Sequence, residues 1–259
     1  MAEATSPPPQ PQRGLNFNAL KEHAITHKID CGLWAMRVLV ILFSTAYFIP
    51  IFGNAQSCYY KVLIANAAIS ALRLHQRLGR VQFSRQFLAE LIQEDSGHYL
   101  FYSLIFIYVA PATLVLLPVL LFAILHASSY SLTLLDTLGQ NSWWGCRLLI
   151  SFVEFQSLNI LKLVALSEIL LMPYAVVMAL SGRAGILTPF IYYNFLSQRY
   201  TSRRNPYTRN MFHELRIVSE NLANKPNMPE IVRKVILSCI AFVSRLSPPV
   251  MQAPPAQAQ

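Results

Sequence analysis

The sequence predicts an all-α polytopic membrane protein, with three or four transmembrane helices and additional amphipathic helices on the cytosolic membrane surface. Charged residues make up 13% of the chain, against roughly 25% in an average soluble domain. No Asp, Glu, Lys or Arg occurs between Ser96 and Leu135, and hydrophobic residues account for 54% of the chain. A run of this length without charge is typical of a bilayer core, so a soluble fold is excluded.

The transmembrane domain is predicted over residues 29–183. Its candidate spans cover residues 33–52, 58–72, 99–125 and 158–181. The first is long enough for a ~30 Å hydrocarbon core, whereas the second would reach only ~22 Å as a helix. The third contains Pro111 and Pro118, which we expect to kink it, and the fourth contains Pro173.

The distribution of positive charge predicts the orientation, because short loops rich in Lys and Arg usually face the cytosol. Several arginines lie in the loop from Arg73 to Asp95, whereas the loop from Leu125 to Trp144 has no Lys or Arg. With four spans, both termini are cytosolic. If the stretch 58–72 does not cross, three spans remain and the N-terminus is lumenal. The C-terminus is predicted to be cytosolic in both cases.

The two ends of the chain are predicted to be disordered. Residues 1–28 are polar and proline-rich, and residues 247–259 form a tail of Pro, Gln and Ala. Residues 184–246 are predicted to form a cytosolic interfacial segment. It begins with an apolar stretch too short to cross the membrane and continues with two amphipathic helices, at 209–223 and 229–246.

The second amphipathic helix has the stronger pattern. Ile231, Val235 and Phe242 fall on its apolar half, and Arg233 and Lys234 fall on the opposite half. This pattern predicts an in-plane helix on an anionic membrane, to which each basic residue contributes about 1 kcal/mol. The alternative is that both amphipathic helices pack on the protein's own membrane domain. The residues predicted to contact the membrane surface or a partner are Arg199, Arg203, Arg204, Arg209, Arg233, Lys234, Val235, Phe242 and Arg245.

Polar residues within the spans are predicted to make contacts between helices. The candidates are Arg37, Asn66, Lys162 and Glu168. Glu168 lies deepest and needs a partner from another span, for which Arg37 and Asn66 are the candidates. Lys162 lies six residues from Glu168, on a different helix face, so the two cannot pair directly. The alternative function is a small transporter or channel component that uses Glu168 and Lys162.

The sequence predicts no catalytic site, cofactor, metal site or small-molecule substrate. The four cysteines contain no CxxC pair, and His23 and His27 have no third ligand nearby. Asp95, Ser96 and His98 are close in sequence without forming a triad, and we expect Asp95 or Ser96 to cap a helix. The Arg and Tyr residues around Arg199 follow an apolar segment, which favours an interfacial belt over nucleic-acid binding.

The stretch GILTPFIYYNFLSQRYTSRRNPYTRNMFHELRI, from Gly185 to Ile217, resembles the transmembrane protein 33 family. This family is also called Krüppel homologue 2 in insects and has relatives among fungal pore-membrane nucleoporins. Further matching pieces follow the same order along the chain. They are ANAAISALRLHQRL, FLAELIQEDSGHYLFYSLIF, NILKLVALSEILLMP and IAFVSRL.

The resemblance implies a non-catalytic, multi-pass protein of the endoplasmic reticulum and nuclear envelope. It also implies roles in shaping or organising reticulum tubules, in supporting nuclear pores and in the unfolded protein response. The implied partners are reticulon-like proteins, nucleoporins or karyopherins, beside an anionic and curved bilayer. The residues themselves predict only the surface helix, and the reticulum and pore roles come from the resemblance.

Overall fold

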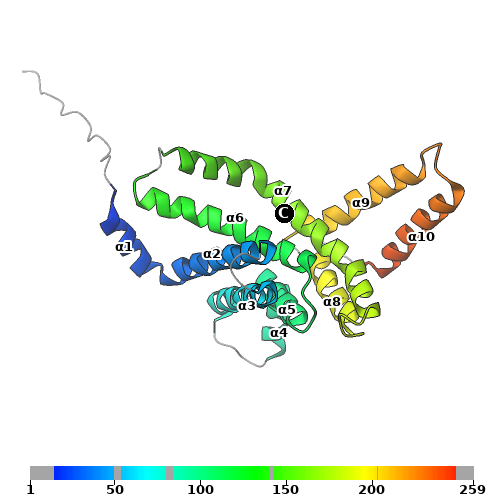
Figure 1. Ribbon diagram of the computed structural model, residues 1–259, viewed down its shortest axis with the longest axis horizontal. Helices are drawn as coiled ribbons and strands as arrows, with labels where there is room; N and C mark the ends of the chain where they lie inside the picture. Colours follow the sequence, from blue (N-terminus) through cyan, green and yellow to red (C-terminus); the bar gives the residue numbers. More distant parts are fainter. Residues whose placement is uncertain (1–14, 50–53, 80–83, 141–142, 203, 249–259) are drawn as a thin grey trace, which may run out of the picture.

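The computed structural model describes residues 15–49, 54–79, 84–140, 143–202 and 204–248, and this part of the chain is entirely helical outside its turns and loops (Figure 1). The helices are α1 (Phe17–Thr26), α2 (Lys28–Phe48), α3 (Ala55–Leu78), α4 (Arg85–Gln93), α5 (Asp95–Ile107), α6 (Thr113–Thr137), α7 (Trp144–Leu180), α8 (Thr188–Thr201), α9 (Tyr207–Ala223) and α10 (Glu230–Leu246). The predicted all-α class is confirmed.

Three of the described helices, α2, α6 and α7, are long and apolar enough to cross a membrane. With 21 residues, α2 would be about 32 Å long at 1.5 Å per residue, which matches a hydrocarbon core. The 37 residues of α7 make a helix of ~55 Å, so part of it must extend beyond the core. Large apolar side chains on the outer faces of these helices remain exposed, such as Leu42 and Phe155, as expected of surfaces that face lipid.

The core of the molecule lies where α2, α3, α5, α6, α7 and α8 meet. Tyr59, Val62, Tyr102, Phe106 and Phe195 are almost completely buried there. The side chain of Asn54 accepts a hydrogen bond from the backbone of Gln56 to begin α3, and Gly79 ends it with a positive φ of 68°. At 24 residues α3 is longer than the predicted stretch 58–72, but it is not apolar enough to count among the candidate spans.

The expected single span at 99–125 is wrong, because the structure divides it into α5 and α6. Pro111 has no backbone N–H and disfavours a helical conformation at Ala110, which explains the interruption. The loop is also held from outside: Ala110 N donates to the carbonyl of Arg183 at 3.1 Å, and Arg183 Nη2 donates to the carbonyl of Pro111 at 3.2 Å. Pro118 is accommodated inside α6.

The N-terminal region also differs from the expected disorder over 1–28, because residues 17–26 form α1. The side chain of Asn16 accepts a hydrogen bond from Ala19 N at 3.0 Å and begins the helix. His23 Nε2 then lies 3.2 Å from the Tyr130 hydroxyl of α6, which attaches α1 to the transmembrane helices. The proline-rich part of the sequence ends at Pro11, within residues that lie outside the described ranges.

Helices α9 and α10 form a hairpin at the opposite end of the molecule from α1 (Figure 1). Helix α8 packs against α5 and α7, and α9 packs against α7 and α8. Tyr192, Phe195 and Leu196 of α8 belong to the core, so this part of the predicted interfacial segment 184–246 is packed into the membrane domain. The structure therefore joins the C-terminal segment to the membrane domain through α8.

Candidate functional site

One face of α8 is buried along its whole length. Tyr192, Phe195 and Arg199 are spaced by three and four residues, so they share this face. All three side chains are at most 1% exposed. The apolar stripe of α8 therefore ends in a buried guanidinium, which needs a partner of opposite charge in the protein interior.

That partner is Glu168 on α7, whose side chain is fully buried. Arg199 Nε donates to Glu168 Oε1 at 3.0 Å and to Oε2 at 3.2 Å. The Tyr99 hydroxyl of α5 donates to Oε1 at 2.6 Å, and Thr208 Oγ1 of α9 donates to Oε2 at 3.1 Å. Both carboxylate oxygens thus receive hydrogen bonds, from three different helices.

Asp95 and Tyr192 complete the buried polar cluster, which we define as Asp95, Tyr99, Glu168, Tyr192, Arg199 and Thr208. Arg199 Nη1 donates to Asp95 Oδ1 at 2.9 Å, and the Tyr192 hydroxyl donates to the backbone carbonyl of Glu168 at 2.8 Å. Burial alone would lower the pKa of Arg199, but the negative charge of Glu168 raises that pKa above its ordinary value. Arg199 therefore stays charged, and the cluster fixes α5, α7, α8 and the start of α9 relative to one another.

A third acidic residue, Glu94, joins the neighbouring loops to the same region. Its carboxylate forms ion pairs with Arg77 at the end of α3, at 2.7 Å, and with Arg204 between α8 and α9. His98 of α5 is also buried, with Nε2 2.6 Å from the carbonyl oxygen of Ile92, and burial lowers the pKa of this histidine. The start of α5 has no side-chain cap, and Asp95 pairs with Arg199 instead, so the expected capping role of Asp95 or Ser96 is wrong.

The structure corrects the predicted partner of Glu168. Neither Arg37 nor Asn66 contacts it; Arg199 does, from a segment expected at the membrane surface. Asn66 instead donates to Ser103 Oγ of α5 at 2.8 Å, and Arg37 is buried at a cavity between helices. Lys162 is about half exposed rather than buried within the membrane domain, and its Nζ pairs with Glu214 of α9 at 2.8 Å.

Helix α9 is partly packed on the membrane domain. Met211 is buried, Phe212 packs against the core and Tyr200, and the ion pair between Lys162 and Glu214 ties the helix to α7. The structure of α9 therefore agrees with the alternative that this amphipathic helix packs on the protein's own membrane domain. The outer part of its apolar stripe, including Val218 and Leu222, remains exposed.

Helix α10 differs because none of its residues is buried. On its predicted apolar half, Ile231 is 78% exposed, Val235 56% and Phe242 63%, whereas Ile236 and Ile240 are partly buried. The Tyr193 hydroxyl of α8 donates to the carbonyl of Leu246 at 2.7 Å and holds the end of α10 near α8. The described part of the chain therefore holds α10 in place and leaves most of its apolar face uncovered.

The predicted surface arginines occupy several environments. Arg233, Lys234 and Arg245 are exposed on α10, Arg204 is mostly exposed in its ion pair with Glu94, and Arg209 is half-buried on α9. Lys234 also pairs with Glu230 one turn away, at 2.8 Å. Arg203 lies outside the described residues.

The sequence reasoning missed Asp95, Tyr99, Tyr192 and Thr208 as members of the buried cluster. One signal was available, since the spacing of Tyr192, Phe195 and Arg199 places the arginine on the apolar face of its helix. Nothing local to Glu168 or Thr208 marks the contact between them, which forms across 40 residues of sequence.

Comparison with known proteins adds a relationship over almost the whole chain. Residues 10–249 match the family described as Transmembrane protein 33/Nucleoporin POM33. The chain is 58% identical over 240 residues to Krueppel homolog 2 of Drosophila melanogaster, covering 93% of this chain and 85% of that protein. It is 46% identical over 252 residues to Transmembrane protein 33 of Homo sapiens, covering 96% of this chain and 100% of that protein. No solved structure matches the chain.

Proposed function

The chain belongs to the Transmembrane protein 33/Nucleoporin POM33 family, and from that premise we propose that it organises curved membrane of the endoplasmic reticulum and nuclear envelope. The proposed action is physical and non-catalytic. The transmembrane helices anchor the protein, the buried polar cluster fixes the C-terminal hairpin, and α10 lies in one leaflet as a wedge. Reticulon-like proteins, nucleoporins or karyopherins are the proposed partners, and support of nuclear pores or of the unfolded protein response is the proposed cellular consequence.

The observation that carries this proposal is the uncovered apolar face of α10. Burying a Val or Phe side chain contributes about 1.5–3 kcal/mol, so leaving several in water is costly. A bilayer surface accepts such a face to a depth of ~5–10 Å, while basic residues beside it contact anionic headgroups. Arg233, Lys234 and Arg245 supply those charges on α10.

Insertion into one leaflet gives the helix a preference for curvature. A helix lying at the headgroup level displaces lipid in that leaflet only, so it is accommodated best where the leaflet is expanded. We propose that this is the cytosolic leaflet, as the positive charge of the C-terminal segment predicts. The anchored position of α10 then couples the curvature of the membrane to the location of the whole protein.

The proposal predicts enrichment of the intact protein on highly curved membrane. The full chain would be reconstituted into giant vesicles containing anionic lipid, and its density on pulled membrane tethers would be compared with its density on the flat membrane. Enrichment of the wild-type protein should disappear in the double variant Val235→Glu/Phe242→Glu. Loss of two buried side chains removes about 3–6 kcal/mol, which is roughly a hundredfold or more in helix insertion.

The matched control is Ser238→Glu/Ser244→Glu. It adds the same charge to the same helix, but on the polar half, so it should retain most of the enrichment. Equal enrichment of the Val235/Phe242 variant and the wild type would mean that α10 engages something other than lipid.

The alternative of transport or conduction through Glu168 and Lys162 is disfavoured by the geometry of both residues. Glu168 is fully buried and receives four hydrogen bonds at its two carboxylate oxygens. Lys162 lies on the outside of α7, paired with α9. A proton or ion pathway would need a polar route to the carboxylate, and Glu168 does not line the neighbouring cavity.

A further inference from the structure

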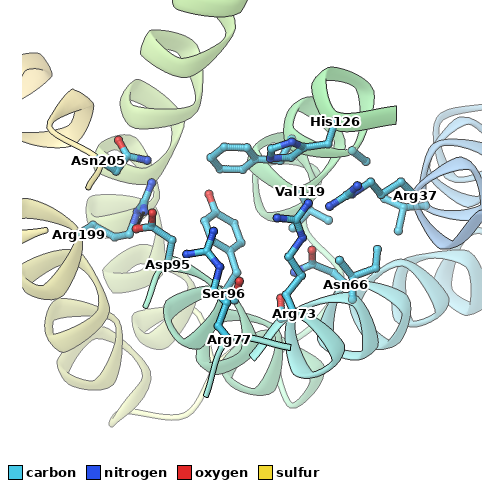
Figure 2. A pocket seen from close by; sticks show the side chains of 16 residues that line it. Arg37, Asn66, Arg73, Arg77, Asp95, Ser96, Val119, His126, Arg199 and Asn205 are labelled. Atoms are coloured by element: carbon cyan, nitrogen blue, oxygen red, sulfur yellow. Dashed lines mark hydrogen bonds and ion pairs between the residues drawn. The ribbon is translucent and has the colours of Figure 1, made fainter. Parts of the chain in front are cut away.

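A cavity of about 210 Å³ lies between α2, α3, α5 and α6, and α8 contributes to its rim (Figure 2). Its lining includes the four arginines Arg37, Arg73, Arg77 and Arg199, but only one carboxylate, that of Asp95. Apolar side chains such as Val119 and Phe122 line the same space. The cavity is therefore strongly basic on one part of its wall and apolar on another.

Two of these arginines are neutralised by the protein. Arg77 pairs with Glu94, and Arg199 pairs with Glu168 and Asp95. The Asp95 carboxylate lies beside Arg199 (Figure 2) and forms no ion pair with Arg37 or Arg73. The remaining positive charge of the cavity belongs to Arg37 and Arg73.

Arg37 and Arg73 have no hydrogen-bond or ion-pair partner among the described residues. Arg37 is only 6% exposed, and the Nε atom of Arg73 is buried without a hydrogen bond. The two side chains point toward each other below His126 (Figure 2), and they are close enough to repel each other electrostatically. Asp30 attracts both from beyond ion-pair distance.

This arrangement is unfavourable for the protein alone. A buried charge without a partner costs several kcal/mol, and a second like charge nearby adds to that cost. An anion between the two guanidinium groups would remove both penalties. Guanidinium groups are particularly suited to phosphate, because their N–H groups can donate to two phosphate oxygens at once.

We propose that this cavity binds a phosphate group between Arg37 and Arg73. Two converging arginines match the double negative charge of a phosphomonoester better than the single charge of a carboxylate. The volume is many times the ~10–15 Å³ that one water requires, which leaves room for a tetrahedral group. The phosphate is carried by a lipid headgroup, whose apolar portion would contact Val119 and Phe122, or by a soluble phosphate compound. This site is separate from the proposed action of α10.

The test uses the full-length protein in detergent with four probes. Inorganic phosphate and glycerol 3-phosphate represent soluble phosphates, dioctanoyl phosphatidic acid represents a phosphomonoester lipid, and dioctanoyl phosphatidylcholine is the zwitterionic control. Binding is measured directly and as a rise in unfolding temperature. We expect saturable binding of dioctanoyl phosphatidic acid and little or none of the phosphatidylcholine probe. Binding of the soluble phosphates as well would show that the phosphate group alone is recognised, whereas binding of the lipid only would identify a membrane headgroup.

Arg37→Gln and Arg73→Gln should each weaken that binding by about tenfold or more, because each loses a charge-assisted contact. Arg216→Gln, which removes the same charge from an exposed ion pair on α9, should bind like the wild type. Arg37→Gln should also unfold at a higher temperature than the wild type without added phosphate, since it removes an uncompensated buried charge. The proposal is overturned if no phosphate probe binds the wild-type protein saturably, or if both Gln variants bind with unchanged affinity.

Discussion

Replacing Arg199 with Met would leave the Glu168 carboxylate fully buried, with two hydroxyl donors and no positive charge. Breaking a buried ion pair by removing one partner typically costs 3–5 kcal/mol, and about 4 kcal/mol is expected here. Glu168→Gln should cost less, about 1.5–3 kcal/mol, because Arg199 keeps its ion pair with Asp95. The two variants differ in stability because Arg199→Met leaves the Glu168 carboxylate without a positive partner, whereas Glu168→Gln leaves Arg199 paired with Asp95.

The double variant Glu168→Gln/Arg199→Met tests this reasoning more strictly than either single variant. It leaves no fully buried charge without a partner, since the Asp95 side chain is 36% exposed, so it should be more stable than Arg199→Met alone. Thermal unfolding in detergent measures this directly: a loss of 4 kcal/mol corresponds to a decrease of roughly 10 °C for a chain of this size. The control is Lys162→Met, which breaks the exposed ion pair with Glu214 and should cost no more than ~1 kcal/mol.

Two results would refute this reasoning. If the double variant is destabilised by the sum of the single effects, the two residues are not energetically coupled. If Arg199→Met is no worse than Lys162→Met, the pair is not buried as described.

Two further predictions concern the junction of α4 and α5. Gly97→Ala should destabilise the protein by about 1–3 kcal/mol, because an added Cβ would lie 2.3 Å from the carbonyl oxygen of Leu91. The control is Gly32→Ala, whose added Cβ would have no neighbouring atom within 4 Å and which should be neutral or slightly stabilising in the same thermal assay. Because burial lowers the pKa of His98 in the folded protein, the unfolded state binds a proton more readily, so stability should fall as the pH drops below about 6.5. His98→Asn should reduce this dependence, and an unchanged pH profile would show that His98 does not contribute to it.

The sequence predicts the transmembrane part best where its pattern is long and continuous. Hydropathy alone locates most of α2 and of α7, because a bilayer core requires an uninterrupted apolar helix. The same measure fails at 99–125, because it records apolar character and not backbone continuity. The prolines indicate a disturbance, but the contacts of Arg183 with the loop, which come from far along the chain, help to make Pro111 a complete break.

Arg199 shows why local composition misled the reading of the C-terminal segment. Surrounded by tyrosines and other arginines after an apolar stretch, it resembles an interfacial belt. Its true environment depends on Glu168, 31 residues earlier on another helix. Only the three- and four-residue spacing with Tyr192 and Phe195 indicates a buried position, and no sequence feature identifies the carboxylate.

The amphipathic helices show the opposite case. The apolar and basic halves of α10 can be read from the sequence, because helical periodicity decides which side chains share a face. Whether such a face packs on the protein or remains uncovered depends on tertiary structure. The two helices differ in this respect. Helix α9 packs in part on α7 and α8, whereas α10 has no buried residue.

The insertion depth of α10 tests the central claim most directly. Cys239 is exposed on its predicted apolar half and can carry a spin or fluorescent label once Cys31, Cys58 and Cys146 are replaced by Ser. In vesicles containing anionic lipid, the label at position 239 should lie ~5–10 Å below the headgroup level and be protected from an aqueous quencher, whereas a label at Ser238→Cys should remain accessible. Equal aqueous accessibility at the two positions would contradict the proposal that α10 lies in the membrane surface.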